Sequence, residues 1–552
     1  MKQKSQDGIT LIALVVTIIV LLILAGVAIT LSIGENGIFK RAGQAADAWE
    51  NATKNEEKEM NSVADIIDSI NGGNSGGGSE KEERNKPNAP SLKTGMTPVK
   101  FNEATVNKKG EIVKTTKEDK DWYSYENKKW ANSETKDGSM WVWIPRYAYR
   151  INSDTQTTDV VFLIGTSDNY YDEQGKVQTA KRCKSKDEKV DTEAGYTVHP
   201  AFTNESSIEY RNGGWDSELT GIWVSKFEAA YATSGEIPNK APVKESSVVY
   251  TQANVWAPLI EAQGVNAGAI DNAEILARNW LDGVYEANKE KIKYPTFQGS
   301  SYAMNYITIN DANNISRSLT EQGNIYGLSS DTDSHLMKNS EWGACAYLAR
   351  SKAYGIGSRD IAVNSKNLNN GGVSTTKEQG NNKASAYAVT GYNSNNNEWN
   401  SYLENNLSAS TTGNMYGIYD MIGCTWERTI GYIYNGSANL ETYGASVISG
   451  KDKSTKYATV YPYSDVGAND DEKSVANYKL NDKIYGDSVR ETSTEGKGST
   501  SWYGDYSYFP GGGSPFFARG GSYGYGGSAG LSAFNRNDGS ATWGNGFRSV
   551  LV

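Results

Sequence analysis

The chain combines one long apolar run near its start with many short apolar runs further along. No ionisable side chain occurs from Ile9 to Ile33. As an α-helix this run would be about 37 Å long, against about 30 Å for the hydrocarbon core of a bilayer. The pattern therefore predicts a helix at 9–33 that enters the membrane, and with it a single-pass protein of the cell membrane whose head lies outside the cell.

Weaker helical periodicity follows this run. Apolar side chains such as Ile38, Trp49 and Ile66 recur at helical intervals between 34 and 70, so an amphipathic extension of the helix is expected there. Residues 71–100 are rich in Gly, Ser and Pro and predict a flexible linker. A folded head is then expected from 101 to 552.

The head contains short aromatic and β-branched runs separated by polar turns, which predict strands. The strand candidates lie at 139–151, 160–164 and 221–227. Helical spacing predicts two helices, at 269–286 and in the second half of 333–349. The expected fold class is α+β, with a long N-terminal helix, a linker and a large head.

Two polar stretches of the head, at about 361–402 and at 435–498, predict surface insertions. Acidic residues between 465 and 472 are expected to form a solvated loop rather than a calcium site. His199 follows an apolar stretch and precedes Pro200, which indicates a hydrogen-bonded core histidine rather than a catalytic one.

Composition limits the classes of partner. The chain of 552 residues has 35 Tyr but 11 Phe, and Tyr supplies both a ring and a hydroxyl to wet binding surfaces. Its net charge of −10 argues against nucleic acid as a partner, because phosphate contacts need a basic surface. We expect a protein or glycan partner outside the cell.

The metal-ligating side chains are few and widely spaced. Cys183, Cys345 and Cys424 are the three cysteines, and no pair of them has the spacing of a zinc site. Burial as small apolar side chains is the expected role of each. Neither a metal nor a cofactor is expected.

Gly8-Ile9-Thr10-Leu11-Ile12, a charged leader ending in Gly before an apolar helix, resembles a type IV prepilin. The resemblance implies a leader at 1–8, cleavage between Gly8 and Ile9 by a prepilin peptidase, methylation of the new amino terminus, and handling by pilus or secretion machinery. Ala13 stands where that family usually has Glu. With so large a head, this difference favours a minor or tip subunit, and a plain surface anchor is the alternative.

A second resemblance lies in the last third of the chain. Residues 413–428, with Asp420-Met421 and Trp426-Glu427, together with Arg519-Gly520-Gly521-Ser522 and Gly546-Phe547-Arg548, are similar to the formylglycine-generating-enzyme (sulfatase-modifying-factor) type of C-type lectin fold. The oxidase chemistry of that family implies two closely placed cysteines near the C-terminus. No cysteine follows Cys424, so we do not expect an enzyme.

Residues 511–552 are the candidate binding segment, in which framework glycines alternate with aromatic and small polar side chains. The spacing resembles the variable proteins of diversity-generating retroelements, which implies adhesin-like ligand contacts that mutagenesis rewrites. The expected contacts are Tyr523, Tyr525, Ser528, Ser532, Asn535, Arg536, Asn537, Asp538, Ser540, Thr542, Trp543 and Asn545.

Two alternatives stay open. One is a carbohydrate-binding protein of fixed specificity with the sulfatase-modifying-factor-like fold. The other is a membrane-tethered enzyme that uses carboxylates such as Glu341 and Glu427. Both carboxylates stand next to Trp in the fold motifs, which favours a structural role for them.

Overall fold

The computed structural model describes residues 86–102, 112–183, 188–204, 213–231, 294–299, 303–305, 307–357, 390, 407–522, 525–542 and 544–552. All of them belong to the second of the two units into which the chain divides, Lys81–Val552.

The largest sheet within these residues has seven strands and contains both early and late parts of the chain. Its strands, in spatial order, are β13 (Ser334–Leu336), β19 (Ser549–Leu551), β10 (Gly221–Ser225), β4 (Met140–Pro145), β3 (Asn132–Glu134), β1 (Thr97–Phe101) and β2 (Ile112–Lys114). β4 lies in the middle of the sheet and is buried along its whole length. It ends at Pro145, as the sequence predicts, because proline cannot donate to the next rung of a ladder.

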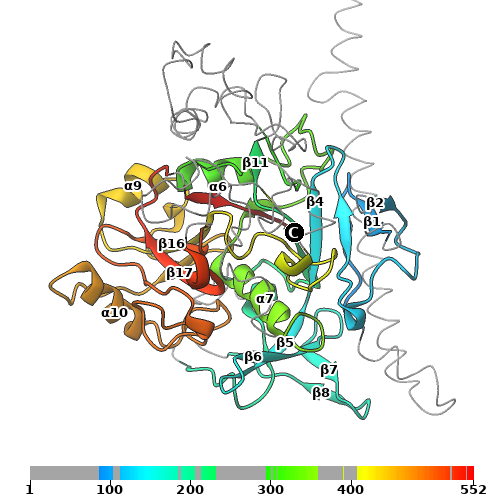
Figure 1. Cartoon of the computed structure of the whole chain (residues 1–552), viewed down its shortest axis with the longest axis horizontal. Coiled ribbons are helices and arrows are strands. Elements are labelled where there is room, and N and C mark those ends of the chain that lie inside the picture. The colour runs from blue at the N-terminus through cyan, green and yellow to red at the C-terminus, as the bar shows by residue number, and fades with distance from the viewer. Residues whose placement is uncertain are drawn as a thin grey trace, which may run out of the picture. The chain divides into compact units, whose positions relative to one another are not determined.

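A second sheet positions the C-terminal segment. It consists of β15 (Thr459–Tyr461), β14 (Trp426–Ile433), β16 (Phe516–Gly520), β17 (Gly530–Asn537) and β18 (Asn545–Phe547). β14 pairs with β16 along one edge and with β18 and β15 along the other. β17 pairs only with β16 among the named strands, and Figure 1 shows these two strands in red beside α7.

The remaining described strands form smaller sheets. These are β6 (Thr157–Phe162), β5 (Tyr147–Asn152) and β9 (Thr197–Val198) in one sheet, and the pairs β7 (Asn169–Tyr171) with β8 (Val177–Thr179) and β11 (Ala230–Tyr231) with β12 (Pro295–Thr296). Short 3-10 turns connect several of these strands, including η3 (Pro200–Phe202) after β9.

The described residues contain four α-helices: α6 (Ile309–Arg317), α7 (Asn339–Arg350), α9 (Ala438–Gly444) and α10 (Asp470–Leu480). Every residue of α7 is buried, and the helix packs on both β6 and β14. It begins at Asn339, with Lys338 at the N-cap position and the Glu341 carboxylate accepting the Lys338 backbone N–H at 2.8 Å. The predicted helix in the second half of 333–349 is therefore confirmed.

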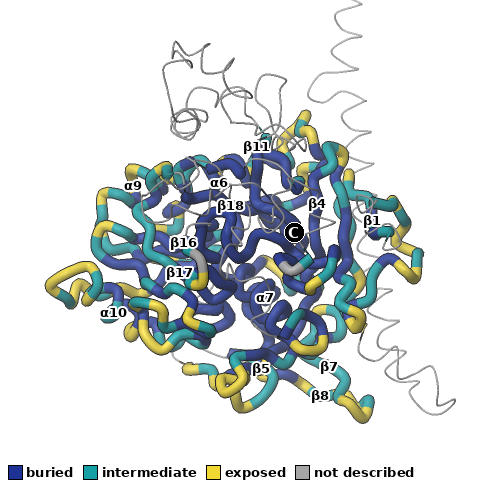
Figure 2. Tube along the Cα trace, viewed as in Figure 1, coloured by how far each residue is buried: buried dark blue, intermediate teal, exposed yellow. Residues whose placement is uncertain are grey.

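Large aromatic side chains fill the main core. Trp141, Trp143, Trp223 and Trp342 are each at most 1% exposed. Figure 2 shows the buried trace running through the sheets and α7, with exposed residues on α10 and on the β7–β8 hairpin. His199 is also buried, and its Nδ1 accepts the Ala201 N–H, as expected for a core histidine.

The expected fold class was wrong in its balance of elements. More of the described residues lie in β-strands than in α-helices, and the four α-helices have only 9, 12, 7 and 11 residues. No long N-terminal helix is among them. The physical reason is the short length of the aromatic and β-branched runs in the head, which match strands better than helices.

The predicted single-pass membrane localisation is also corrected. Within the part of the chain that the structure describes, no helix is both long enough and apolar enough to cross a membrane. The structure therefore gives no support to a single-pass protein. The cleavage point between Gly8 and Ile9, the 9–33 helix, the 34–70 extension and the 269–286 helix all lie outside the described residues, as does most of 361–402.

The 435–498 segment, expected as a surface insertion, contributes to the fold. It contains α9, β15 and α10, and β15 extends the second sheet by pairing in parallel with β14. Tyr461 and Tyr478 from this segment pack with Phe509 and Phe517 in a separate apolar cluster. The 435–498 segment is polar over most of its length, but its few apolar residues anchor it to the fold.

Candidate ligand-binding site

The cross-strand register of the second sheet brings part of the C-terminal segment to one face. Trp426 on β14 lies opposite Asn545 on β18, and Ala518 on β16 lies opposite Asn535 on β17. Directly paired residues share a face of a sheet, and so do residues two apart on one strand. Arg428, two residues after Trp426, pairs with Ala518. Trp426, Arg428, Asn535 and Asn545 therefore lie on the same face.

Four aromatic rings gather on this face. The Trp426 ring meets Tyr525 edge to face with 5.0 Å between centroids, and meets Tyr506 at 5.8 Å. Tyr506 in turn contacts the Tyr525 ring at 5.3 Å and stacks on Tyr508 at 5.0 Å. Trp426 is 4% exposed, whereas the three tyrosines are half-buried. We call Trp426, Tyr506, Tyr508, Tyr525, Asn535 and Asn545 the aromatic face.

The two tyrosines at 506 and 508 are placed by the edge of β17. The Tyr506 N–H donates to Ser528 O at 2.9 Å, and the Tyr506 and Tyr508 backbones exchange hydrogen bonds with Phe534. This segment follows the outer edge of β17, and alternate residues of an extended chain point the same way. Tyr506 and Tyr508 therefore lie side by side.

Close contact between the segment and β17 requires a glycine. A Cβ atom on Gly530 would lie 2.0 Å from an Asp505 carboxylate oxygen, closer than real Cβ contacts allow. The Asp505 carboxylate also accepts the Ser532 backbone N–H at 3.0 Å. Asp505 is thus part of the framework that positions the rings.

Several neutral polar groups of the aromatic face have no hydrogen-bond partner among the described residues. The Trp426 Nε1–H is buried and makes no hydrogen bond to any described residue. No hydrogen bond within the described part of the chain engages the Asn535 amide or the hydroxyls of Tyr506, Tyr508 and Tyr525. A buried indole N–H usually has a hydrogen-bond acceptor, because burying the donor without a hydrogen bond costs about 1–3 kcal/mol.

Arg536, the charged side chain beside the aromatic rings, is engaged within the protein. Its guanidinium lies 5.1 Å from the Tyr508 ring centroid and pairs with Asp471 at 2.9 Å. It also donates to Ser474 Oγ at 3.0 Å. Such pairing makes Arg536 a support for Tyr508 rather than a free cation.

A second arginine holds the turn after β17. Arg428 donates to Asn537 Oδ1 at 2.7 Å, to the Ser540 carbonyl oxygen and to Ile307 O at 3.2 Å. Burial lowers the pKa of Arg428 to about 10, although the nearby Asp538 carboxylate opposes the shift. Arg428 therefore remains charged at neutral pH and fixes the 537–540 turn.

The predicted contact residues are placed unequally. Half-buried positions are Tyr525, Ser528, Asn535, Arg536, Asn537, Asp538, Ser540 and Thr542. Ser532 is 1% exposed and Asn545 is 6% exposed. Tyr523 and Trp543 lie outside the described residues.

Ser532 lies on the face of β17 opposite to the aromatic rings. It alternates with Ala533 along β17, so it points to the opposite side from the aromatic rings, where its Oγ accepts a hydrogen bond from Ser488 Oγ at 3.3 Å. We therefore leave Ser532 out of the site. Asn537 and Asp538 also use their carbonyl and carboxylate oxygens internally, on Arg428 and Ser540.

Sequence reasoning missed Trp426, Tyr506 and Tyr508 as site residues. Trp426 belongs to a motif that was assigned to the fold, and the two tyrosines lie before the segment at 511–552. The signal available was the alternation Tyr506-Ser507-Tyr508, which places two aromatic side chains on one side of an extended segment.

Glu341 and Glu427, the carboxylates of the enzyme alternative, are buried and paired with basic side chains. Glu427 is 1% exposed and forms a two-pronged ion pair with Arg548, at 2.5 and 2.6 Å. Glu341 is fully buried and lies 3.0 Å from His335 Nε2. Neither carboxylate faces the aromatic face or open solvent.

Acidic side chains of the 465–472 stretch interact with other groups of the protein. Glu472 accepts the Ala468 N–H, and Asp471 pairs with Arg536 and Lys497. No group of three His, Cys, Asp or Glu side chains that could hold a metal ion occurs within the described residues. Cys183, Cys345 and Cys424 are buried, and none of them forms a disulfide within the described residues.

Comparison of the chain with protein-family models and with curated proteins finds no match. The resemblances to prepilins, to the formylglycine-generating-enzyme type of lectin fold and to retroelement variable proteins therefore stay predictions.

Proposed function

We propose that the chain is a non-enzymatic binding protein and that its aromatic face holds an uncharged glycan. One observation carries this proposal: the Trp426 indole N–H is buried, has no hydrogen-bond partner among the described residues, and lies against tyrosine rings that are half-exposed. A ligand oxygen would supply the missing acceptor once a covering group, such as the Tyr525 ring that packs on the indole, moves aside.

The rings favour a ligand that is apolar on one side. Tyrosine and tryptophan offer large rigid areas and lose little conformational entropy on binding. The C–H groups of a sugar ring can pack on such surfaces while its hydroxyls remain free for hydrogen bonds. Tyr506, Tyr508 and Tyr525 each combine a ring with a hydroxyl that has no partner in the described residues.

Charge distinguishes a neutral glycan from a charged ligand. The free polar groups of the aromatic face are an indole N–H, an amide and phenol hydroxyls, all uncharged. Arg428 and Arg536 are engaged by protein oxygens, and Asp538 is engaged by Ser540. A charged peptide or an anionic glycan would bury its charge here without a counter-ion, which is costly.

Catalysis by Glu341 and Glu427 is disfavoured by their positions. Each is buried in an ion pair, and breaking such a pair leaves an uncompensated charge. A hydrolase of glycans would instead need two carboxyl groups flanking the bound sugar. We therefore assign the aromatic face to recognition and not to turnover.

The test is a panel of neutral and anionic oligosaccharides presented to the full chain and to the Trp426→Phe variant. We expect binding of a neutral member and a loss of about tenfold in affinity in the variant, because phenylalanine keeps a ring but lacks the N–H. Binding of anionic members only, binding unaffected by the variant, or hydrolysis of a bound oligosaccharide would each contradict the proposal. If a protein ligand binds instead and its binding is lost in Trp426→Phe, the aromatic face remains the binding site but the glycan is refuted as its ligand.

A further inference from the structure

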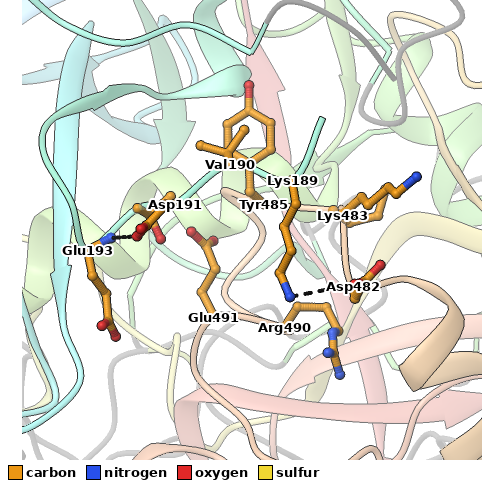
Figure 3. A pocket seen from close by; sticks show the side chains of 11 residues that line it. Lys189, Val190, Asp191, Glu193, Asp482, Lys483, Tyr485, Arg490 and Glu491 are labelled. Atoms are coloured by element: carbon orange, nitrogen blue, oxygen red, sulfur yellow. Dashed lines mark hydrogen bonds and ion pairs between the residues drawn. The ribbon is translucent and has the colours of Figure 1, made fainter. Parts of the chain in front are cut away.

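A cavity away from the aromatic face lies between two segments that are distant in sequence. Its volume is about 400 Å³, within the range of small-molecule sites. Residues 189–193 form one wall, and residues 482–485 with Arg490 and Glu491 form the other. Figure 3 shows Glu491 between the two segments, with its carboxyl group directed towards the 189–193 wall.

The Glu491 carboxyl group is held firmly in place. It accepts the hydroxyl of Tyr149 at 2.7 Å, the hydroxyl of Tyr347 at 2.6 Å and the Gly486 N–H at 2.5 Å. These donors come from β5, from α7 and from the loop that precedes Glu491. Three donors on one carboxyl group orient it and favour its charged form.

No cation among the described residues neutralises this carboxyl group. Three basic residues line the cavity, yet Glu491 forms no ion pair with any described residue. Lys189 pairs with Asp482 at 3.5 Å, and the Arg490 guanidinium lies 3.6 Å from the Tyr478 ring centroid. In Figure 3 the Arg490 guanidinium and the Lys483 ammonium both point away from Glu491.

The consequence is a carboxyl group that changes charge near neutrality. Burial raises the pKa of Glu491 to about 7, although the hydrogen bonds from Tyr347, Tyr149 and Gly486 oppose the shift. A cation in the cavity would favour the charged form and lower this pKa again.

The titratable groups packed near Glu491 include two tyrosines, a histidine and two aspartates. The pKa values of Tyr149 and Tyr347 are raised well above their usual range by burial. Burial lowers the pKa of His199, which packs on both tyrosine rings, to about 3. The Asp487 carboxyl group accepts the Tyr461 hydroxyl, and Asp191 accepts the backbone N–H groups of 193 and 194.

We infer that this cavity binds a small organic ammonium ion, whose charge pairs with Glu491. Val190, Ile484 and Tyr485 supply apolar wall for the hydrocarbon part of such a ligand. A metal ion would need several oxygen or nitrogen ligands, and no group of three suitable acidic, His or Cys side chains exists in the described residues. This site is independent of the aromatic face.

The experiment is a calorimetric titration of the full chain with n-butylamine at about pH 6, 7 and 8. The amine remains protonated throughout, whereas Glu491 must lose its proton to form the pair. Affinity should therefore rise with pH and fall about tenfold for each unit well below pH 7. n-Butanol, which has the same hydrocarbon chain without the charge, should bind at least about tenfold more weakly.

Two variants and one control separate binding from folding. Glu491→Gln should remove both the affinity and its pH dependence. Tyr149→Phe keeps the carboxyl group but removes one donor, so the midpoint of the pH profile should move to higher pH. Glu193→Gln changes another residue of the cavity wall, whose carboxylate is engaged by Ser153, and should change affinity less than about twofold.

Three results would overturn the inference. They are equal binding of butylamine and butanol, an affinity that does not vary with pH, and an unchanged pH profile in both Glu491→Gln and Tyr149→Phe. Displacement of the amine by millimolar calcium would assign the cavity to a metal ion instead. None of these results bears on glycan binding at the aromatic face.

Discussion

The Trp426 indole ring stands edge to face against the Tyr525 ring, with 5.0 Å between centroids and 84° between planes. One residue lies on β14 and the other close to the start of β17, so the contact joins the centre of the second sheet to the C-terminal segment. Tyr525 covers one side of the indole and remains half-buried itself. This pair is the core of the proposed glycan site.

Replacing Tyr525 with Ala should weaken glycan binding by about tenfold or more. The change removes one ring that a sugar could contact and uncovers Trp426, while no fully buried side chain is replaced. Tyr463→Ala is the matched control, because Tyr463 is 43% exposed and is not part of the aromatic face. Equal losses in the two variants would assign binding to general surface properties and not to this site.

Arg428→Lys should loosen the turn at 537–540 without unfolding the protein. Lysine keeps the charge but cannot reach Asn537, Ser540 and Ile307 together, because it lacks the planar fork of arginine. We expect a loss of about 1–3 kcal/mol of stability and several-fold weaker glycan binding. Urea unfolding and glycan titration of the same sample would measure both, and unchanged values for both would refute the positioning role.

Glu427→Gln should destabilise the protein by about 3–5 kcal/mol, because Arg548 would be left charged and buried without its partner. Asp159→Asn breaks an ion pair with Arg150 that is 45% and 40% exposed, and should cost less than about 1 kcal/mol. Chemical denaturation of the three proteins compares them. A stable Glu427→Gln variant that has lost a catalytic activity would instead favour the enzyme alternative.

Stability should fall at alkaline pH through His335. Burial opposes protonation of its ring, but the charge of Glu341 and the hydrogen bonds with Asp333 and Glu341 outweigh it, so the pKa of His335 is raised. Its stabilising contribution is thus present below about pH 6.5 and is lost as pH rises through the raised value. The pKa values of Asp333 and Glu341 are lowered by His335 against the effect of burial, so their contribution is lost as pH falls.

The free energy of unfolding, measured with urea from acidic to alkaline pH, tests whether His335 causes the alkaline loss of stability. His335→Gln should remove the alkaline decline, whereas His199→Gln should keep it, since His199 is uncharged in the folded protein. The account of His335 fails if its replacement leaves the slope of stability against pH unchanged.

Gly343→Ala should destabilise α7, although alanine is the better helix former by about 1 kcal/mol. A Cβ atom at this position would lie 2.0 Å from the Gly486 carbonyl oxygen, and the backbone there must move. We expect a net loss of about 1–3 kcal/mol. Asn314→Ala, at an exposed position of α6, should instead raise stability by a few tenths of a kcal/mol.

The sequence could predict those elements whose signal is local. The run Met140-Trp141-Val142-Trp143-Ile144 indicates a strand by its aromatic and β-branched residues, and Pro145 marks its end. The start of α7 near Asn339 was likewise readable from the helical spacing after it. The balance of the fold could not be predicted in this way, because the first apolar run is the strongest local pattern, whereas the described residues contain more short strands than helices.

The site depended on pairings that no local pattern contains. Tyr525 and Asn535 were found because they lie in the segment chosen by resemblance, but Trp426 comes to them from about a hundred residues earlier, through the register of β14 with β16 and β18. Register also decides which serines are accessible. The sequence alone does not show that Ser532 lies on the other face, because a shift of one residue along a strand exchanges the two faces of a sheet.

The most direct test follows the indole N–H resonances of the full chain by NMR while the neutral oligosaccharide panel is added. One resonance, assigned to Trp426 by its absence in Trp426→Phe, should move on binding, and the oligosaccharide should be recovered unchanged. If a sugar binds while that resonance stays in place, or if the sugar is cleaved, the proposed recognition role of the aromatic face is contradicted.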